Sequence, residues 1–127
     1  MVERNPYKQE KELDKDLVNK IANLLFARPD GVMFKLFDLG NLAFSQEKNF
    51  VYRNQIGSIM RKFSKQLQEG NDFSLLMRDL ERELWKVFRI ACIDGVQFEA
   101  CFVEAKKIIG ILVSEWKASG AEFTEER

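Results

Sequence analysis

The sequence predicts an all-α protein, a single-domain bundle of about five antiparallel helices, and three observations support this prediction. Apolar residues recur with a period near 3.6 along almost the whole chain. The 127 residues are 46% hydrophobic and include only 2 prolines, a composition typical of a compact helical protein. The links between the apolar stripes are short, so consecutive helices are expected to pack as antiparallel neighbours. A chain of this length is one domain by the usual size range.

The first two helices are separated by an evident turn. The first helix is expected over about residues 8–27, because its leucine and isoleucine side chains fall on one face. The RPDG turn at residues 28–31 ends it. The second helix is expected over about residues 32–46, with Asp30 as its N-terminal cap. Gly40, in its interior, is expected to be a point of close packing or a weak spot.

Glycine and aspartate mark the boundary between the third and fourth helices. A polar link at residues 47–49 precedes the third helix, which is expected over about residues 52–68. Gly70 then suits the left-handed conformation that follows a helix C-terminus. Asp72 is the expected cap of the fourth helix, over about residues 73–94.

The fifth helix, expected over about residues 97–117, has the most regular apolar pattern in the chain. The single domain spans residues 1–127, and its ends, residues 1–7 and 119–127, are expected to be frayed. Cys92 and Cys101 are flanked by apolar residues, and we expect both to be reduced core thiols.

Several residue types and motifs that catalysis commonly needs are missing. The chain has no histidine, which removes the commonest general base and the commonest metal ligand. No GxGxxG, GxxxxGK[ST] or HExxH motif is present. The carboxylates of the first helix alternate with lysines, a pattern typical of a solvated face. The sequence therefore predicts a protein that is not an enzyme and has no catalytic residues, no cofactor and no metal site.

The location of the protein is also expected from charge and hydropathy. The first sixteen residues are densely charged, which argues against a signal peptide. The longest apolar run is far too short to span a bilayer. We therefore expect a cytoplasmic protein with no membrane contact.

Positive charge is concentrated in the middle of the chain. Residues 48–68 contain five cations and no carboxylate, although the whole chain balances 20 Lys and Arg against 20 Asp and Glu. Residues 53–89 contain eight cations and five anions. At about 100° per residue, most of these cations fall opposite the apolar stripes of the third and fourth helices. The eight candidate contacts for a polyanion are Arg53, Arg61, Lys62, Lys65, Arg78, Arg82, Lys86 and Arg89.

The third and fourth helices, if they are neighbours, bring these two basic stripes to one groove. A groove lined in this way is expected to bind a phosphate backbone along its length. Arginine suits this role because its guanidinium donates two hydrogen bonds to one phosphate. Polar side chains that share the basic half of the third helix are candidate donors to sugars and phosphates: Asn54, Gln55, Ser58 and Ser64. Tyr52 and Trp85 are candidates for stacking on bases, with core or rim packing as the alternative. No base-reading module is present, so RNA contact is expected to be indifferent to base sequence.

Three short stretches add a family resemblance. They are NQI at 54–56 followed by RKF at 61–63, the segment LWKVFRIACIDG at 84–95, and FVEA at 102–105. They resemble elements of the small helical subunit of Csm-type (type III-A) CRISPR effector complexes. Two positions depart from the family's pattern, because Gly57 and Val96 stand where the family has arginine.

The resemblance implies a non-catalytic protein that stacks in copies along a duplex of crRNA and target RNA, beside other CRISPR effector subunits. Its basic residues would then contact RNA phosphates. The positions that carry over are Arg53, Arg61, Lys62, Arg82, Lys86 and Arg89. Lys65 and Arg78 come from the charge pattern alone.

A second hypothesis is a helical protein–protein interaction or dimerisation module with no role in nucleic-acid binding. It is motivated by 11 Phe and 4 Met residues and by the continuous apolar face of the fifth helix. It predicts self-association, as a dimer or a filament, or capture of a partner. Both hypotheses can hold together, since a filament subunit needs both surfaces.

Overall fold

The computed structural model describes residues 14–124, and these form an all-α bundle, which confirms the predicted fold class. Five helices are present in this part of the chain. Their bounds are α1 (Lys15–Phe26), α2 (Val32–Ala43), α3 (Gln46–Gln68), α4 (Phe73–Ala91) and α5 (Gly95–Ala118).

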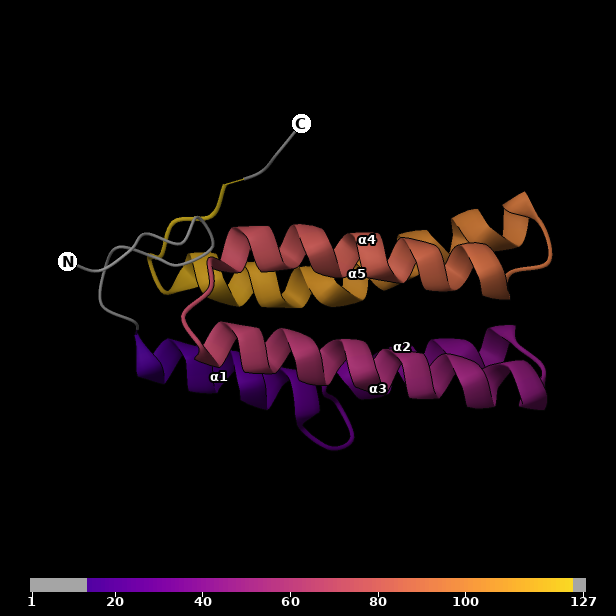
Figure 1. The fold of residues 1–127 in the computed structure, drawn as a ribbon, viewed down its shortest axis with the longest axis horizontal. Helices are drawn as coiled ribbons and strands as arrows, with labels where there is room; N and C mark the ends of the chain where they lie inside the picture. The colour runs from indigo at the N-terminus through magenta and orange to yellow at the C-terminus, as the bar shows by residue number, and fades with distance from the viewer. Residues whose placement is uncertain (1–13, 125–127) are drawn as a thin grey trace.

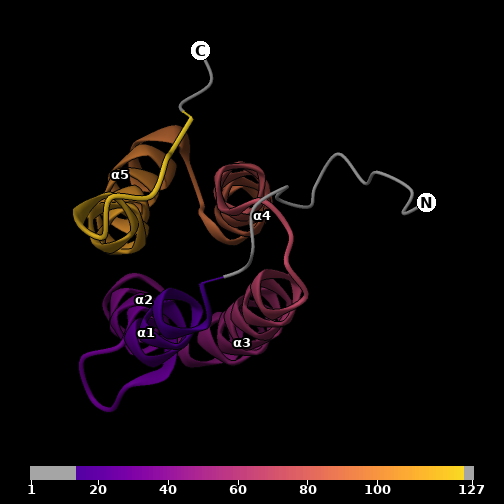
Figure 2. The same ribbon diagram turned by 90° about the vertical axis from the view of Figure 1, so that its left-hand side faces the viewer.

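The five helices occupy four positions in the bundle (Figure 1). Helices α1 and α2 lie in line, run in the same direction and together form one side of the bundle, so that they overlap in the end view (Figure 2). Both pack against α3 and α5. Helix α4 completes the bundle and, in the described residues, packs on α3 and α5 alone. Antiparallel packing is thus confirmed for α2 with α3, α3 with α4 and α4 with α5, but it is wrong for α1 with α2.

The link between α1 and α2 explains this exception. The N–H of Gly31 donates to the carbonyl oxygen of Ala27 at 2.7 Å, which closes a tight turn. The turn displaces the helix axis without reversing the chain (Figure 1). The expected cap, Asp30, is wrong by one position, because Gly31 is the N-cap of α2 and makes no side-chain capping bond.

The link between α2 and α3 lies nearer the N-terminus than expected. Helix α2 ends at Ala43, and the Ser45 hydroxyl accepts from the N–H of Lys48 at 3.4 Å as the cap of α3. Residues 47–49, predicted as a polar link, therefore form the first turns of α3. Ser45 is a favourable capping residue, but the predicted bounds followed the spacing of the apolar residues, which does not include it.

The two later boundaries depend on aspartate caps. Asp72 caps α4 by accepting from the N–H of Ser74 at 2.9 Å, and Gly70 has a φ of +91°, so both predictions are confirmed. Asp94 accepts from the N–H of Gln97 at 2.8 Å and begins α5. Helix α4 therefore ends at Ala91, three residues before the predicted end.

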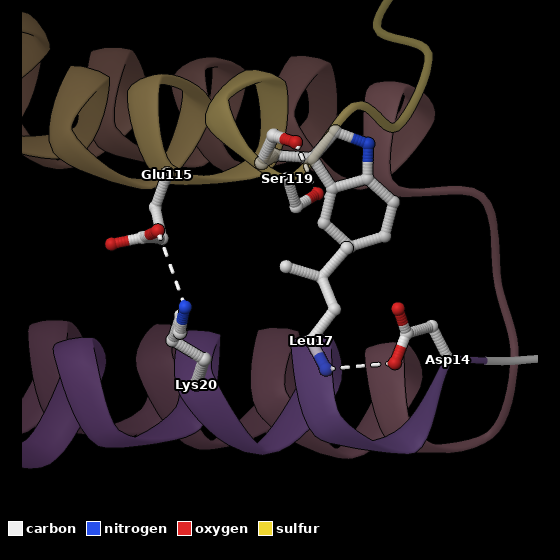
Figure 3. Close-up of polar contacts among 6 residues, drawn as sticks. Asp14, Leu17, Lys20, Glu115 and Ser119 are labelled. Atoms are coloured by element: carbon white, nitrogen blue, oxygen red, sulfur yellow. Dashed lines mark hydrogen bonds and ion pairs between the residues drawn. The ribbon is translucent and has the colours of Figure 1, made fainter.

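Helix α1 begins after Asp14, whose carboxylate accepts from the N–H of Leu17 at 3.1 Å (Figure 3). The earlier part of the predicted first helix, residues 8–13, lies outside the described residues. An ion pair of 3.8 Å between Lys20 and Glu115 joins α1 to α5 at the same end of the bundle (Figure 3).

The segment after α5 packs on the bundle, so the fraying predicted from residue 119 does not hold up to Thr124. The indole N–H of Trp116 donates to the carbonyl oxygen of Glu122 at 2.9 Å. The N–H of Thr124 donates to the Ser74 hydroxyl at 2.9 Å. The Phe123 ring lies 5.9 Å from that of Phe73. These contacts hold the segment against the bundle. The predictions for residues 1–7 and 125–127 lie outside the described residues.

A cluster of aromatic rings fills the core where the α2–α3 link lies against α3 and α4. The Tyr52 ring lies 5.0 Å from Phe44 and 5.5 Å from Phe88, between ring centroids. The Tyr52 hydroxyl donates to the carbonyl oxygen of Leu36 at 2.6 Å, and burial raises its pKa far above the ordinary value.

Of the helices described, none combines the length and the apolar character needed to cross a bilayer.

Candidate functional site

The predicted groove between the two basic helices is present. Helices α3 and α4 pack side by side, and a groove of about 490 Å³ runs between them. Its α3 wall includes Ser58, Lys62 and Gln66, and its α4 wall includes Arg82 and Lys86. The structure therefore brings three of the eight candidate cations to one concave surface.

Two carboxylates in the α4 wall of this groove reduce its positive charge. Asp79 lies 3.5 Å from Arg82, and Glu83 lies 3.5 Å from Lys86. All four side chains are at least 40% exposed. Exposed pairs of this spacing contribute only about 0.3–0.5 kcal/mol each. Both cations can therefore leave their carboxylates at little cost when a stronger anion enters the groove.

The other candidate cations of α3 do not line the groove. The Arg53 guanidinium lies over the Phe37 ring of α2, 4.6 Å from its centroid. Arg61 folds back against its own helix, so that a Cβ atom added at Gly57 would lie 3.0 Å from its Nη1 atom. Lys65 is exposed. The basic residues of α3 therefore spread around the helix rather than forming one face.

The remaining cations of α4, Arg78 and Arg89, lie on other parts of the surface. Arg78 faces α5 and lines two hollows of about 410 and 550 Å³, together with Glu81. Arg89 lies in the last turn of α4, where a positive charge favours the helix dipole. Neither residue lines the groove between α3 and α4, although Arg78 shares the hollow of about 550 Å³ with Arg82.

The burial of α3 also corrects one of the four polar candidates. Ser64 is only 7% exposed, and its neighbour Gly57 on the same helix is buried. The Ser64 hydroxyl accepts from the side-chain N–H of Gln68 at 3.4 Å. Three neighbouring helices contact α3, so the buried arc is wider than one apolar stripe indicates. Asn54, Gln55 and Ser58 remain exposed, as predicted.

The two aromatic candidates for base stacking separate clearly. Tyr52 is 1% exposed and belongs to the core, so its assignment to base stacking is wrong. Trp85 is 45% exposed, with its ring edge-on to Phe98 at 5.9 Å. It lines the hollow of about 550 Å³ that Arg78 and Arg82 also border. Trp85 therefore keeps its place as a stacking candidate, beside the groove rather than within it.

The apolar face of α5, which motivated the interaction hypothesis, packs inside the bundle. Leu112 is 0% exposed, and Ala105 and Ile109 are also buried. The centre of this face is therefore covered by the bundle, whereas Phe102 and Val113 at its edges are half-buried. Exposed apolar side chains occur instead at the opposite end of the bundle from Asp14, a feature that helical periodicity did not single out.

The two cysteines pack close to each other, and no disulfide joins them. Burial, together with a smaller effect of the neighbouring Cys101 thiol, raises the pKa of the Cys92 thiol from 9.0 to about 11. Burial also raises the pKa of Cys101. Both groups are therefore thiols rather than thiolates at neutral pH. Among residues 14–124, no group of His, Cys, Asp and Glu side chains is placed to hold a metal ion.

We expect Cys92 to react slowly with an alkylating reagent. With a pKa of about 11 instead of 9.0, its thiolate fraction at pH 8 falls about a hundredfold, and only the thiolate is nucleophilic. Mass spectrometry after iodoacetamide treatment, in buffer and in denaturant, measures this ratio. Because the folded pKa is raised, the associated stability is present below pH 9 and is lost as the pH rises toward 11. Equal rates in buffer and in denaturant would contradict the burial of this thiol.

Comparisons of the chain with protein-family models, with curated proteins and with solved structures found no match.

Proposed function

We propose that this chain is a non-catalytic subunit of a ribonucleoprotein and that it binds the phosphate backbone of RNA in the groove between α3 and α4. The observation that carries the proposal is the meeting of Lys62 with Arg82 and Lys86 across that groove. These cations come from two neighbouring helices, and they share one concave surface. The resemblance to the small subunit of Csm-type CRISPR effector complexes points the same way, with crRNA and target RNA as the ligands and other effector subunits as partners.

The chemistry of the groove suits a phosphate backbone. Arginine and lysine donate to phosphate oxygens, and Arg82 offers a bidentate donor. Ser58 and Gln66 supply neutral donors on the opposite wall. Phosphate contacts fix the position of a chain of nucleotides but carry no information on base sequence. The groove therefore supports RNA binding that is independent of sequence.

The carboxylates of the groove set the expected affinity. Asp79 and Glu83 must give up their ion pairs with Arg82 and Lys86 when phosphate binds. These pairs are exposed and weak, but the carboxylates then remain beside a polyanion. We therefore expect weak binding by one subunit, which copies along one RNA would strengthen through multivalency.

The test is fluorescence anisotropy with labelled single-stranded RNAs of unrelated sequences at several salt concentrations. In the groove variant Lys62→Gln/Arg82→Gln/Lys86→Gln, three phosphate contacts are lost without adding negative charge. The slope of log affinity against log salt should fall by about 2, because each phosphate contact contributes about 0.7. At about 0.1 M salt, the affinity should fall roughly a hundredfold.

The matched control is Lys15→Gln/Lys106→Gln/Lys107→Gln, which removes the same charge from exposed positions on α1 and α5. Lys107 also pairs with Glu104 at i,i+3 spacing, as the groove cations do with their own carboxylates. The control should keep most of the affinity and the slope. Unchanged binding by the groove variant, or equal losses in both variants, would overturn the assignment of this groove.

A further inference from the structure

One end of the bundle carries a concentration of exposed apolar side chains. This end contains the α2–α3 link and the α4–α5 link (Figure 1). Of the eight large apolar residues that are exposed in the described structure, six lie here, and we call them the apolar end. They are Leu42, Phe50, Val51, Ile90, Ile93 and Val96, with exposed fractions from 55% to 89%.

The apolar end is held together by polar contacts between the helix ends that flank its two links. The Lys48 ammonium donates to the carbonyl oxygen of Ala91 at 3.3 Å. The Gln97 side-chain N–H donates to the carbonyl oxygen of Ala43 at 3.0 Å, and its side-chain oxygen accepts from the N–H of Ile93 at 2.6 Å. The two links are therefore fixed to each other. The six side chains form part of a preorganised surface rather than of loose loops.

The area of this surface matches that of a stable interface. At the exposures above, the six side chains present on the order of 600 Å² of apolar surface. Monomeric proteins rarely expose contiguous apolar patches above a few hundred Å². A stable interface covers about 800 Å² on each partner, of which about 65% is apolar in homodimers. The apolar end is thus large enough to be the apolar part of a complete interface.

The charges at the rim of the apolar end favour a second copy of the same chain. Glu47 and Asp94 balance Lys48 and Arg89, and all four residues are exposed. In a contact about a two-fold axis, each copy brings the same rim to the other. A rim without net charge therefore avoids repulsion between the two copies. A polyanion or an anionic membrane would instead meet Glu47 and Asp94 with repulsion.

Two other arrangements fit less well. The opposite end of the bundle, with the start of α1 and the α3–α4 link, carries none of the eight exposed large apolar residues of the described structure. Head-to-tail stacking would therefore place apolar side chains against a polar surface. Coverage by the chain's own N-terminal segment is also disfavoured, since six of the thirteen residues before Asp14 are charged.

We infer that the chain forms an isologous homodimer through the apolar end, with two bundles joined end to end. The contact is closed by its two-fold symmetry, so it stops at two copies. This inference does not rest on RNA binding, because the groove lies along the side of the bundle and the dimer buries its end.

The test is sedimentation velocity of the full chain over a wide concentration range. The unmodified chain should approach twice its 14.9 kDa mass and grow no further. Ile93→Glu places a like charge from both copies in the interface and should raise the dissociation constant about a hundredfold or more. Leu42→Glu, on α2, should do the same. Both positions are more than 80% exposed, so helicity by circular dichroism should not change.

The matched control is Val103→Glu, which changes an exposed apolar residue on α5 outside the apolar end. It should leave the dissociation constant unchanged, as should the groove variant Lys62→Gln/Arg82→Gln/Lys86→Gln. Any one of four results would overturn the inference: a chain that stays monomeric, growth beyond two copies, dimers unaffected by Ile93→Glu and Leu42→Glu, or a monomer that binds phosphatidylcholine vesicles through this end.

Discussion

Replacing Phe88 by alanine should lower the free energy of unfolding by about 3–5 kcal/mol. The Phe88 ring is 0% exposed and packs 5.5 Å from the Tyr52 ring and 6.3 Å from the Phe44 ring. Tyr52 is held in place by its 2.6 Å hydrogen bond to the carbonyl oxygen of Leu36. The surrounding structure therefore cannot collapse into the space that Phe88 leaves. The loss combines the transfer energy of the ring with the cost of a cavity.

Denaturant unfolding followed by circular dichroism measures this effect, and the melting temperature should fall by about 10–20 °C. The control is Trp85→Ala, three residues earlier on the same helix. Trp85 is 45% exposed and has one aromatic contact at 5.9 Å, so its loss should stay below about 1.5 kcal/mol. Both variants must be compared with the unmodified chain at one protein concentration, since dimer formation makes stability depend on concentration. Similar losses in the two variants would show that this aromatic cluster is not the rigid part of the core.

Gly40→Ala should also be strongly destabilising, although alanine is the better helix former. A Cβ atom at this position would overlap the Tyr52 ring and lie 2.5 Å from Oδ1 of Asn49. Helix α2 can therefore approach α3 this closely only with glycine at position 40. Alanine should gain up to about 1 kcal/mol in helix propensity, but forcing apart a packed core costs about 1–3 kcal/mol and occasionally more. We expect a net loss of about 2 kcal/mol.

The matched control is Gly110→Ala in the interior of α5. A Cβ atom there meets nothing within 4 Å, so the propensity gain should appear alone and raise stability by about 0.5–1 kcal/mol. Opposite signs for the two substitutions in the same unfolding experiment would confirm that packing, not propensity, decides at Gly40. Stabilisation by both would contradict the close contact between α2 and α3.

Much of the fold could be predicted because it depends on local chemistry. The periodic apolar residues defined five helices and the all-α class, and Gly70 and Asp72 set the α3–α4 boundary correctly. Each of these signals acts within a few residues of the position that it controls. The boundary between α2 and α3 was missed because Ser45 caps a helix whose first turns look polar in sequence. The apolar periodicity of α3 begins only after its first turn, so the capping serine was the only signal of where the helix starts.

The candidate site was predicted in part for a similar reason. Sequence placed Lys62, Arg82 and Lys86 on helices expected to be neighbours, and the structure brings them to one groove. It did not separate them from Arg53 or Arg61, because a helical wheel gives directions but not neighbours. Arg53 faces Phe37 of α2, and Arg61 covers Gly57. The position of Arg53 follows from how α3 packs on α2, which no property of α3 alone determines.

The sequence by itself determined that this protein is helical, that its excess of positive charge lies on α3 and α4, and that it has no histidine side chain. These properties belong to single residues or single helices. The tertiary structure alone decided that α1 and α2 share one position in the bundle, that Tyr52 is core, and that six apolar side chains meet at one end. The physical reason is that burial depends on which helices surround a residue. Periodicity can identify the apolar face of a helix, but only packing determines what covers it.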